Sequence, residues 1–220
     1  TEDIKKAYRL ADGKSYTDDG AVYMRFIAPP RLVDGSENNI KLTYKNDFPR
    51  EYPQVLPVSG QKIGFGVDTH AFGEGEFITL AGVKIPCGKS LIAHSDGDVI
   101  IHAVMDAYLS AAGLKDIGHY FPDTDESTLN ADSAKMLEKV IETVKNAGYI
   151  GGNLSVTVQA ETPRLSPYID KMAHRLGEIC KLPPENIAIA AGTCEHLGFV
   201  GEGLGITAYC AVLLKSNKEI

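Results

Sequence analysis

The Asp68-Thr69-His70 triplet and His102 are the residues of this sequence best suited to bind a metal ion. If residues 62–68 form a strand that leads into His70, then Asp68 and His70 project to the same side of it. His102 is the natural third ligand, because it lies on the polar stripe of a predicted helix. Two imidazoles and one carboxylate suit zinc, and three protein ligands leave a fourth position open for a substrate. The pattern therefore predicts a catalytic zinc site.

The residues around His102 strengthen this prediction. An Asp-x-His triplet is common by itself, and a single histidine on a buried helix is more often an ordinary core residue. Between His94 and His102, however, two histidines and two aspartates surround the apolar start of the predicted helix, and burying so much polarity without a ligand is costly. Asp98 and Asp106 lie one turn on either side of His102, so either could accept a hydrogen bond that orients its imidazole.

Two segments before and after the predicted helix could bind phosphate. His94 and Ser95 precede the helix start, where backbone N–H groups favour an anion. Ser95 or Asp96 could equally be the N-cap of that helix. The turn-rich loop of residues 121–125 could also take part in phosphate binding, or it could be a plain surface connection.

A third candidate segment lies at residues 191–195. It follows a predicted strand, and Gly192 allows the backbone to approach a phosphate closely. Glu195 could hold a hard cation such as Mg²⁺, which prefers carboxylates together with substrate phosphates. The neighbouring Cys194 is interpreted as a packing residue.

Apolar periodicity predicts the elements that position these residues. The predicted strands cover residues 62–68, 77–83, 153–159, 186–191 and 204–214, and the predicted helices cover 98–112, 132–146 and 167–181. Their order indicates an α+β domain, residues 61–220, in which helices are layered on one face of a sheet.

Residues 1–60 differ from the rest of the chain. They hold five of its eleven prolines. Two strand-like runs, Val22–Ile27 and Ile40–Lys45, could form a hairpin across the turn-rich residues 34–36. We interpret residues 1–60 as a partly ordered N-terminal extension.

Composition excludes several classes of protein. Residues 1–60 carry equal numbers of acidic and basic side chains, so the net charge of −7 belongs entirely to residues 61–220. This balance argues against a nucleic-acid-binding surface, which needs a basic stripe. No apolar run is long enough to span a membrane. The spacing of the four cysteines suggests no disulfide framework and favours a reducing compartment.

Together, these motifs resemble the 2-C-methyl-D-erythritol 2,4-cyclodiphosphate synthase family. The match runs from about residue 63 to residue 215, so residues 1–60 lie outside it. The matching segments are Asp68 to His70, His94 to Asp98, His102, Asp116 to Gly118, Phe121 to Asp125, and Glu195 to Phe199. Taken together in this order and at this spacing, the segments identify the family far more specifically than any single segment does.

The resemblance implies a ferredoxin-like-derived sheet that assembles as a homotrimer, with active sites between adjacent subunits. It implies a small-molecule substrate, a cytidine diphosphate derivative of methylerythritol 2-phosphate, which is cyclised with release of CMP. It places Zn²⁺ on Asp68, His70 and His102, and a second divalent ion, Mg²⁺ or Mn²⁺, on Glu195. No nucleic acid or membrane partner is expected.

The resemblance also implies roles for individual residues. His94 and Ser95 hold the 2-phosphate, and residues 160–166 cradle the cytosine largely through backbone groups. The residues predicted to be catalytic are His94, Asp98, Thr193 and Glu195. The residues predicted to bind substrate are His94, Ser95, Asp116, Gly118, Phe121, Asp123, Asp125, Ala160, Pro163, Arg164, Leu165, Thr193 and Phe199.

Several positions depart from the family pattern, including Glu161, Thr162 and Arg164 in the predicted cytosine-binding segment, where recognition through backbone groups survives such changes. Gly192 stands where the family often has a threonine, so one phosphate-binding hydroxyl is missing. Glu202 stands where many members have an arginine that lines a channel on the trimer axis. We therefore expect this channel not to bind an isoprenoid diphosphate.

Other functions remain open at this point. A zinc hydrolase that uses a metal-bound hydroxide would release a linear product, and a non-catalytic trimeric binding module would show no turnover.

No glycine-rich nucleotidyltransferase start is visible in residues 1–60, so we expect a form that is not fused to that enzyme. The extension, with any leader peptide removed, favours a plastid-type organelle; a bacterial cytoplasm is the alternative.

Overall fold

The computed structural model describes residues 2–31, 33–35, 60–122 and 131–217. Its contacts divide the chain into two units, Thr1–Val55 and Leu56–Ile220. Each unit is described by itself. Among the described residues, no helix is both long and apolar enough to cross a membrane.

The first unit contains two short helices, α1 (Glu2–Leu10) and α2 (Asp19–Phe26), which pack against each other. The buried side chains between them are Ala7, Ala11 and Val22.

The predicted strand Val22–Ile27 is therefore wrong, because most of this run is the second half of α2. Asp18 begins that helix by accepting a hydrogen bond from the Ala21 N–H at 2.8 Å, which is the usual role of an aspartate N-cap. The other predicted strand, Ile40–Lys45, lies outside the described residues, and so does the hairpin it would form.

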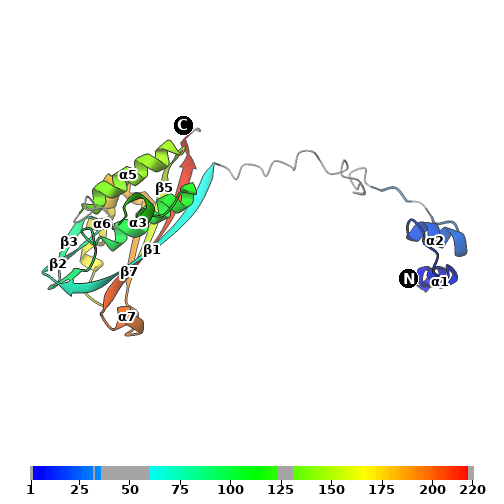
Figure 1. Cartoon of the computed structure of the whole chain (residues 1–220), viewed down its shortest axis with the longest axis horizontal. Helices are drawn as coiled ribbons and strands as arrows, with labels where there is room; N and C mark the ends of the chain where they lie inside the picture. Colours follow the sequence, from blue (N-terminus) through cyan, green and yellow to red (C-terminus); the bar gives the residue numbers. More distant parts are fainter. Residues whose placement is uncertain (1, 32, 36–59, 123–130, 218–220) are drawn as a thin grey trace. The chain divides into compact units, whose positions relative to one another are not determined.

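The second unit carries the remaining elements (Figure 1). Its strands are β1 (Gln61–Glu74), β2 (Phe77–Leu80), β3 (Val83–Pro86), β4 (Lys89–Leu91), β5 (Tyr149–Gln159), β6 (Ile187–Gly192) and β7 (Gly205–Ser216). Its α-helices are α3 (Val99–Ala112), α4 (Ile117–Tyr120), α5 (Ser133–Asn146), α6 (Ile169–Cys180) and α7 (Gly198–Gly201), and short 3₁₀ turns are η3 (Ser166–Tyr168) and η4 (Pro184–Asn186).

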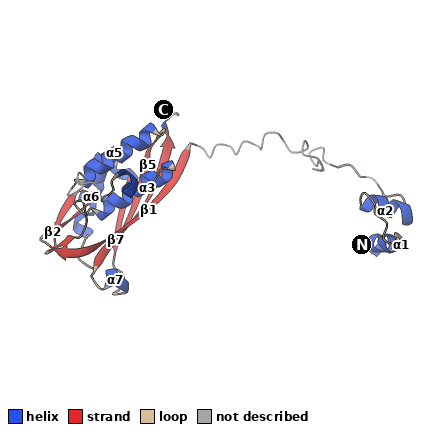
Figure 2. Ribbon diagram, in the orientation of Figure 1, coloured by secondary structure: helices blue, strands red, loops and turns tan. Residues whose placement is uncertain are grey.

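Five strands form one mixed sheet in the order β4-β1-β7-β5-β6, in which only β5 and β6 pair in parallel. β2 and β3 form a separate hairpin. Helices α3, α5 and α6 cover one face of the sheet (Figure 2). The prediction of a mixed fold with a sheet and helices is confirmed, and its ferredoxin-like derivation stays a prediction.

Local turns account for the differences from the predicted elements. The predicted strand 77–83 is two strands, because Ala81 and Gly82 adopt positive φ angles of 51° and 71° and turn the chain back. Asp98 is the N-cap of α3, in place of Ser95 or Asp96. β4, α4 and α7 have only three or four residues each, too few to show a periodicity in the sequence.

Helix α3 packs directly on the backbone of β1. A Cβ atom at Gly64 would lie 2.0 Å from the Ala107 carbonyl oxygen, and one at Gly66 would lie 2.1 Å from the Ala103 carbonyl oxygen. Only glycine permits this approach. Asp68 and His70 continue the same face of the strand, so the close contact brings the N-terminal half of α3 beside them.

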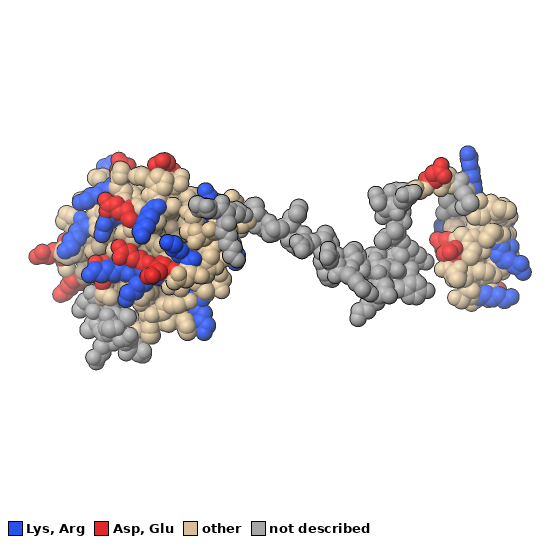
Figure 3. All heavy atoms as spheres, turned by 90° about the horizontal axis from the view of Figure 1, so that it is seen from above, with Lys and Arg blue, Asp and Glu red and all other residues tan. Residues whose placement is uncertain are grey.

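The opposite face of β1 is apolar and exposed. Ile63, Phe65 and Val67 have exposed fractions of 80%, 58% and 44%. Contiguous exposed apolar side chains commonly mark an interaction surface. Elsewhere the surface differs: Figure 3 shows basic and acidic side chains interspersed over one face of this unit, with no broad basic area on that face.

Substituting Gly66→Ala should destabilise the second unit, because its methyl group would force α3 away from β1. We expect a loss of about 3 kcal/mol in the free energy of unfolding, measured by urea denaturation of the full chain. The control is Gly118→Ala, whose Cβ would meet its nearest atom at 3.7 Å. Equal unfolding midpoints for the two variants would contradict the packing argument.

Candidate metal centre and substrate site

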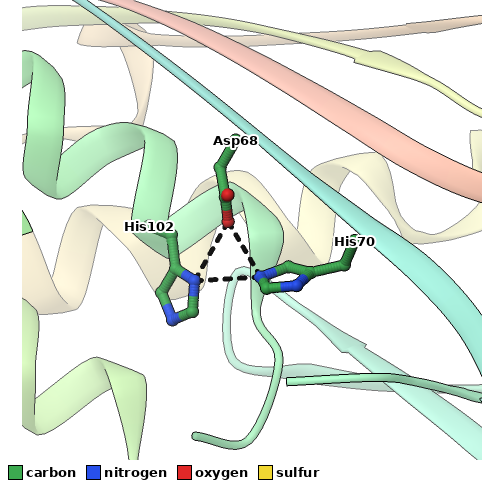
Figure 4. A group of neighbouring side chains, drawn as sticks. All are labelled: Asp68, His70 and His102. Atoms are coloured by element: carbon green, nitrogen blue, oxygen red, sulfur yellow. Dashed lines mark hydrogen bonds and ion pairs between the residues drawn. The ribbon is translucent and has the colours of Figure 1, made fainter. Parts of the chain in front are cut away.

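Asp68, His70 and His102 bring one ligand atom each to a common point (Figure 4). The Asp68 Oδ2 atom lies 2.9 Å from His70 Nε2 and 3.0 Å from His102 Nδ1, and the two nitrogens are 3.1 Å apart. Strand β1 supplies the first two residues and helix α3 supplies the third. The predicted convergence of these three side chains is confirmed.

The His70 ring is oriented by a backbone carbonyl. Its Nδ1 atom lies 3.1 Å from the Ile92 oxygen. A carbonyl oxygen only accepts, so Nδ1 carries the proton and donates it. In the neutral ring, Nε2 therefore presents its lone pair to the ligand cluster.

The His102 ring is oriented by two hydroxyl groups. Its Nε2 atom lies 3.1 Å from Ser133 Oγ and 3.0 Å from Ser95 Oγ. The Ser133 hydroxyl donates a short hydrogen bond to Asp96 Oδ1, so it must accept from His102 Nε2–H. This network assigns the lone pair of the neutral ring to Nδ1, which faces the cluster.

Three acceptor atoms consequently face one another at about van der Waals distance or less. Such a cluster is repulsive unless a cation lies among the three atoms. Tetrahedral zinc with ligand bonds of 2.0–2.2 Å separates its ligand atoms by about 3.3 Å, a few tenths of an ångström more than observed here. The donor set thus fits a zinc ion after a small adjustment.

When the imidazoles are protonated, their N–H groups take the place of a metal ion and donate hydrogen bonds to Asp68. Burial raises the pKa of Asp68, but hydrogen bonds from His102 and His70 outweigh it and hold that pKa well below its ordinary value. Burial lowers the pKa of His70, and the hydrogen bond and charge of Asp68 outweigh it, so the net direction is upward. The carboxylate is therefore ionised and available to a cation across the neutral pH range.

Asp98, which was predicted to be catalytic, lies away from the metal ligands' meeting point and bonds to backbone groups. It is fully buried, its Oδ1 accepts from the N–H groups of Ala81 and Ile101, and its Oδ2 accepts from the N–H of Gly82. Burial raises its pKa to about 6. Asp98 therefore ties the β2–β3 turn to the start of α3, a positioning role for the whole helix.

Asp106 does not orient His102 either, since its carboxylate accepts from the Ile117 N–H at 2.9 Å. Within the described residues, the orienting groups are the two serines and Asp96. Sequence reasoning missed Ser133. It identified the start of α5 at Asp132, but no pattern in the sequence connects that helix start with His102, 31 residues earlier.

A pocket of about 350 Å³ opens beside the three ligands. Of the residues predicted to bind substrate, His94, Ser95, Gly118 and Phe121 line it. Asp116 instead caps α4 through the His119 N–H and lines a separate hollow of about 470 Å³. The predicted residues Asp123 and Asp125 lie outside the described residues.

A second cluster of predicted residues lies where β5 and β6 end. Thr193 Oγ1 donates to Glu195 at 3.0 Å, and the Ala160 N–H donates to the Gly192 oxygen at 3.0 Å. The backbone of residues 160–161 thus runs beside that of residues 192–196. The structure brings Thr193, Glu195 and the predicted cytosine-binding segment together.

The other predicted residues of this region lie on the same end of the fold. Leu165 is buried, and Arg164 Nε donates to Ser166 Oγ at 2.9 Å. Pro163 precedes them in the same loop. Phe199 belongs to α7 and is 49% exposed, and it is not among the residues that line the pocket beside the metal ligands.

Within one chain, the two clusters are separated by the width of three strand pairings. Thr69 of β1 pairs with Thr207, which pairs with Gln159, which pairs with Gly192 of β6. Three spacings of about 4.8 Å place these rows about 14 Å apart. The two clusters therefore belong to strands that are not neighbours in the sheet.

The family model of the YgbB family matches residues 61–215, which is most of the chain. The chain belongs to the YgbB family. Its relatives include the 2-C-methyl-D-erythritol 2,4-cyclodiphosphate synthase of Lysinibacillus sphaericus, which is 45% identical over 153 residues, covering 70% of this chain and 97% of that protein. The family predicted from the motifs is confirmed.

Another group of YgbB-family relatives is longer. The bifunctional enzyme IspD/IspF of Campylobacter fetus subsp. fetus is 41% identical over 215 residues, which cover 98% of this chain but 57% of that protein. The solved bifunctional IspDF from Campylobacter jejuni is 35% identical with a TM-score of 0.70, and the same shares of the two chains are covered. The chain thus spans somewhat more than half the length of these relatives.

A solved 2C-methyl-D-erythritol-2,4-cyclodiphosphate synthase in a CDP-bound form is also similar. It is 34% identical with a TM-score of 0.65, and the match covers 70% of this chain and all of that one.

These comparisons bear on three expectations. The bifunctional relatives align with nearly the whole chain, so the similarity to known proteins extends into residues 1–60. The same alignment with bifunctional relatives removes the basis for expecting a form that is not fused to a second enzyme. The plastid prediction is not supported, since these relatives come from bacteria.

Substituting Ser133→Ala should weaken zinc binding about 10- to 100-fold, because His102 would lose the acceptor that fixes its ring. Competition against a chelator, with the full chain, measures this affinity. The matched control is Ser110→Ala, an exposed serine on the same helix as His102. If both variants bind zinc like the unsubstituted protein, the orienting role of Ser133 is wrong.

Proposed function

We propose that this chain cyclises a cytidine diphosphate derivative of methylerythritol 2-phosphate to methylerythritol 2,4-cyclodiphosphate and releases CMP. The observation that carries the proposal is the Asp68–His70–His102 centre in a YgbB-family domain. The match to synthases over nearly their whole length supports it. In this reading residues 61–220 form the catalytic domain.

The chemistry requires no nucleophile from the protein, because the substrate's own 2-phosphate attacks the β-phosphorus of the diphosphate. Phosphoryl transfer then depends mainly on positioning and on neutralising charge. Zn²⁺ on the three ligands, with Mg²⁺ or Mn²⁺ on Glu195, would supply Lewis acids toward the phosphate oxygens. His94 and Ser95, which line the same pocket, are suited to donate hydrogen bonds to the 2-phosphate.

The nucleotide end of the substrate is assigned to the second cluster. Two solved relatives are complexes with CDP. The loop from Ala160 to Ser166 and the loop from Gly192 to Glu195 lie side by side, so the first can hold the base while Thr193 and Glu195 serve the phosphates. Because Leu165 is buried and Arg164 is bonded to Ser166, base recognition falls mainly to backbone groups.

The separation of the two clusters supports an assembly with active sites between subunits, which we propose to be a homotrimer. The backbone rows that carry the two clusters are about 14 Å apart in one chain, which favours a diphosphate bound by one cluster from each of two chains. The exposed apolar face of β1, with Ile63, Phe65 and Val67, offers a surface for this contact. The organisms of the relatives favour a bacterial source.

Incubating the purified chain with the cytidine substrate, Zn²⁺ and Mn²⁺ should give CMP and the cyclic diphosphate in equal amounts. Phosphorus NMR distinguishes the cyclic diphosphate from linear phosphates. His102→Ala should abolish turnover. A linear hydrolysed product would instead indicate the zinc hydrolase, and no turnover with zinc bound would indicate a binding module.

Mixing two inactive variants tests the shared site. His102→Ala damages the first cluster and Glu195→Ala the second, so each protein alone should be inactive. After the two are unfolded and refolded together in equal amounts, about a quarter of the interfaces should carry neither substitution and regain activity. Co-refolding that gives a single mass of three chains without any activity would contradict sites shared between subunits.

A further inference from the structure

Glu161 joins the two loops of the second cluster. Its Oε1 atom accepts hydrogen bonds from the Cys194 N–H at 2.9 Å and from the His196 N–H at 3.3 Å. The side chain of Glu161 is only 12% exposed. A mostly buried carboxylate at the start of one loop therefore holds the backbone on both sides of Glu195 in the other.

The segment that Glu161 holds has an unfavourable backbone conformation. Glu195 and His196 have φ angles of 51° and 63°, in the left-handed region that residues with a Cβ rarely adopt. Two such residues in succession persist only where the surroundings hold them. The bonds from Glu161 fall on the residue before Glu195 and on His196, so they fix the turn that aims the Glu195 carboxylate.

Further contacts of this turn lie at the His196 ring and within its own backbone. The His196 ring is 90% exposed and its Nδ1 atom lies 3.8 Å from Glu161 Oε2, so the pair is largely screened by solvent. The Leu197 N–H donates to the Cys194 oxygen within the turn. Glu161 is the side chain that connects the turn to the loop of residues 160–166.

We propose that Glu161 is a positioning residue that couples nucleotide binding at residues 160–166 to divalent-metal binding at Glu195. The proposal rests on the proposed function, which places the nucleotide and the second ion there. When the base orders its loop, Glu161 holds the Glu195 turn in its bound conformation. By linkage, a metal ion on Glu195 then raises nucleotide affinity by the same factor as the nucleotide raises metal affinity.

The test measures CDP affinity of the zinc-loaded full chain by calorimetry, with and without Mn²⁺. In the unsubstituted protein, Mn²⁺ should tighten CDP binding. Glu161→Ala should reduce this enhancement about tenfold, because both N–H groups lose their acceptor. Glu161→Gln should keep it within about threefold, since the amide oxygen accepts the same bonds. The control is Glu185→Ala, an exposed glutamate before β6.

A second readout needs no ligand. Amide hydrogen exchange at Cys194 and His196 should be about tenfold faster in Glu161→Ala than in the unsubstituted protein, and unchanged in Glu185→Ala. Zinc content should be the same in all variants, because the three zinc ligands lie on other elements.

The outcomes separate the two proposals. Unchanged Mn²⁺ enhancement in Glu161→Ala overturns the coupling, and so does a Glu161→Gln protein as impaired as Glu161→Ala. If the unsubstituted, zinc-loaded chain binds no CDP, the proposed function fails and the coupling with it. CDP binding that is enhanced by Mn²⁺ only in proteins that keep an acceptor at position 161 supports both.

Discussion

The mutual repulsion of three lone pairs is the constraint on which the rest of the structure depends. With both imidazoles neutral, Asp68, His70 and His102 can hold their acceptor atoms about 3 Å apart only if a cation lies among them. The fold forces this proximity, because glycines in β1 let α3 rest on the strand backbone. The hydrogen bonds to Ile92 and Ser133 then direct the imidazole lone pairs inward.

The same sheet that builds the metal centre also separates it from the residues suited to bind the nucleotide. Strand pairing fixes β1 and β6 three spacings apart. An open apolar sheet face beside a half-complete site is the geometry expected of a chain that works as an assembly. Fold, surface and chemistry therefore support the proposed assembly.

Much of the site could be predicted from the sequence, because residue spacing on a strand or helix fixes which side chains share a face. This placed Asp68 and His70 together, and the apolar stretch after Asp98 identified α3. The sequence could not reveal the partners of Asp98 or the contact of Ser133 with His102, since both depend on segments far apart in the chain. The first unit was misread because Val22–Ile27 suits a strand by composition, whereas the Asp18 cap decides for a helix.

X-ray diffraction from crystals of the zinc-loaded chain, with data at the zinc absorption edge, tests the central claim most directly. The account predicts one strong anomalous peak per chain, about 2.0–2.2 Å from Asp68 Oδ2, His70 Nε2 and His102 Nδ1. A zinc peak bound by other residues, or none at this position in zinc-saturated crystals, would contradict it.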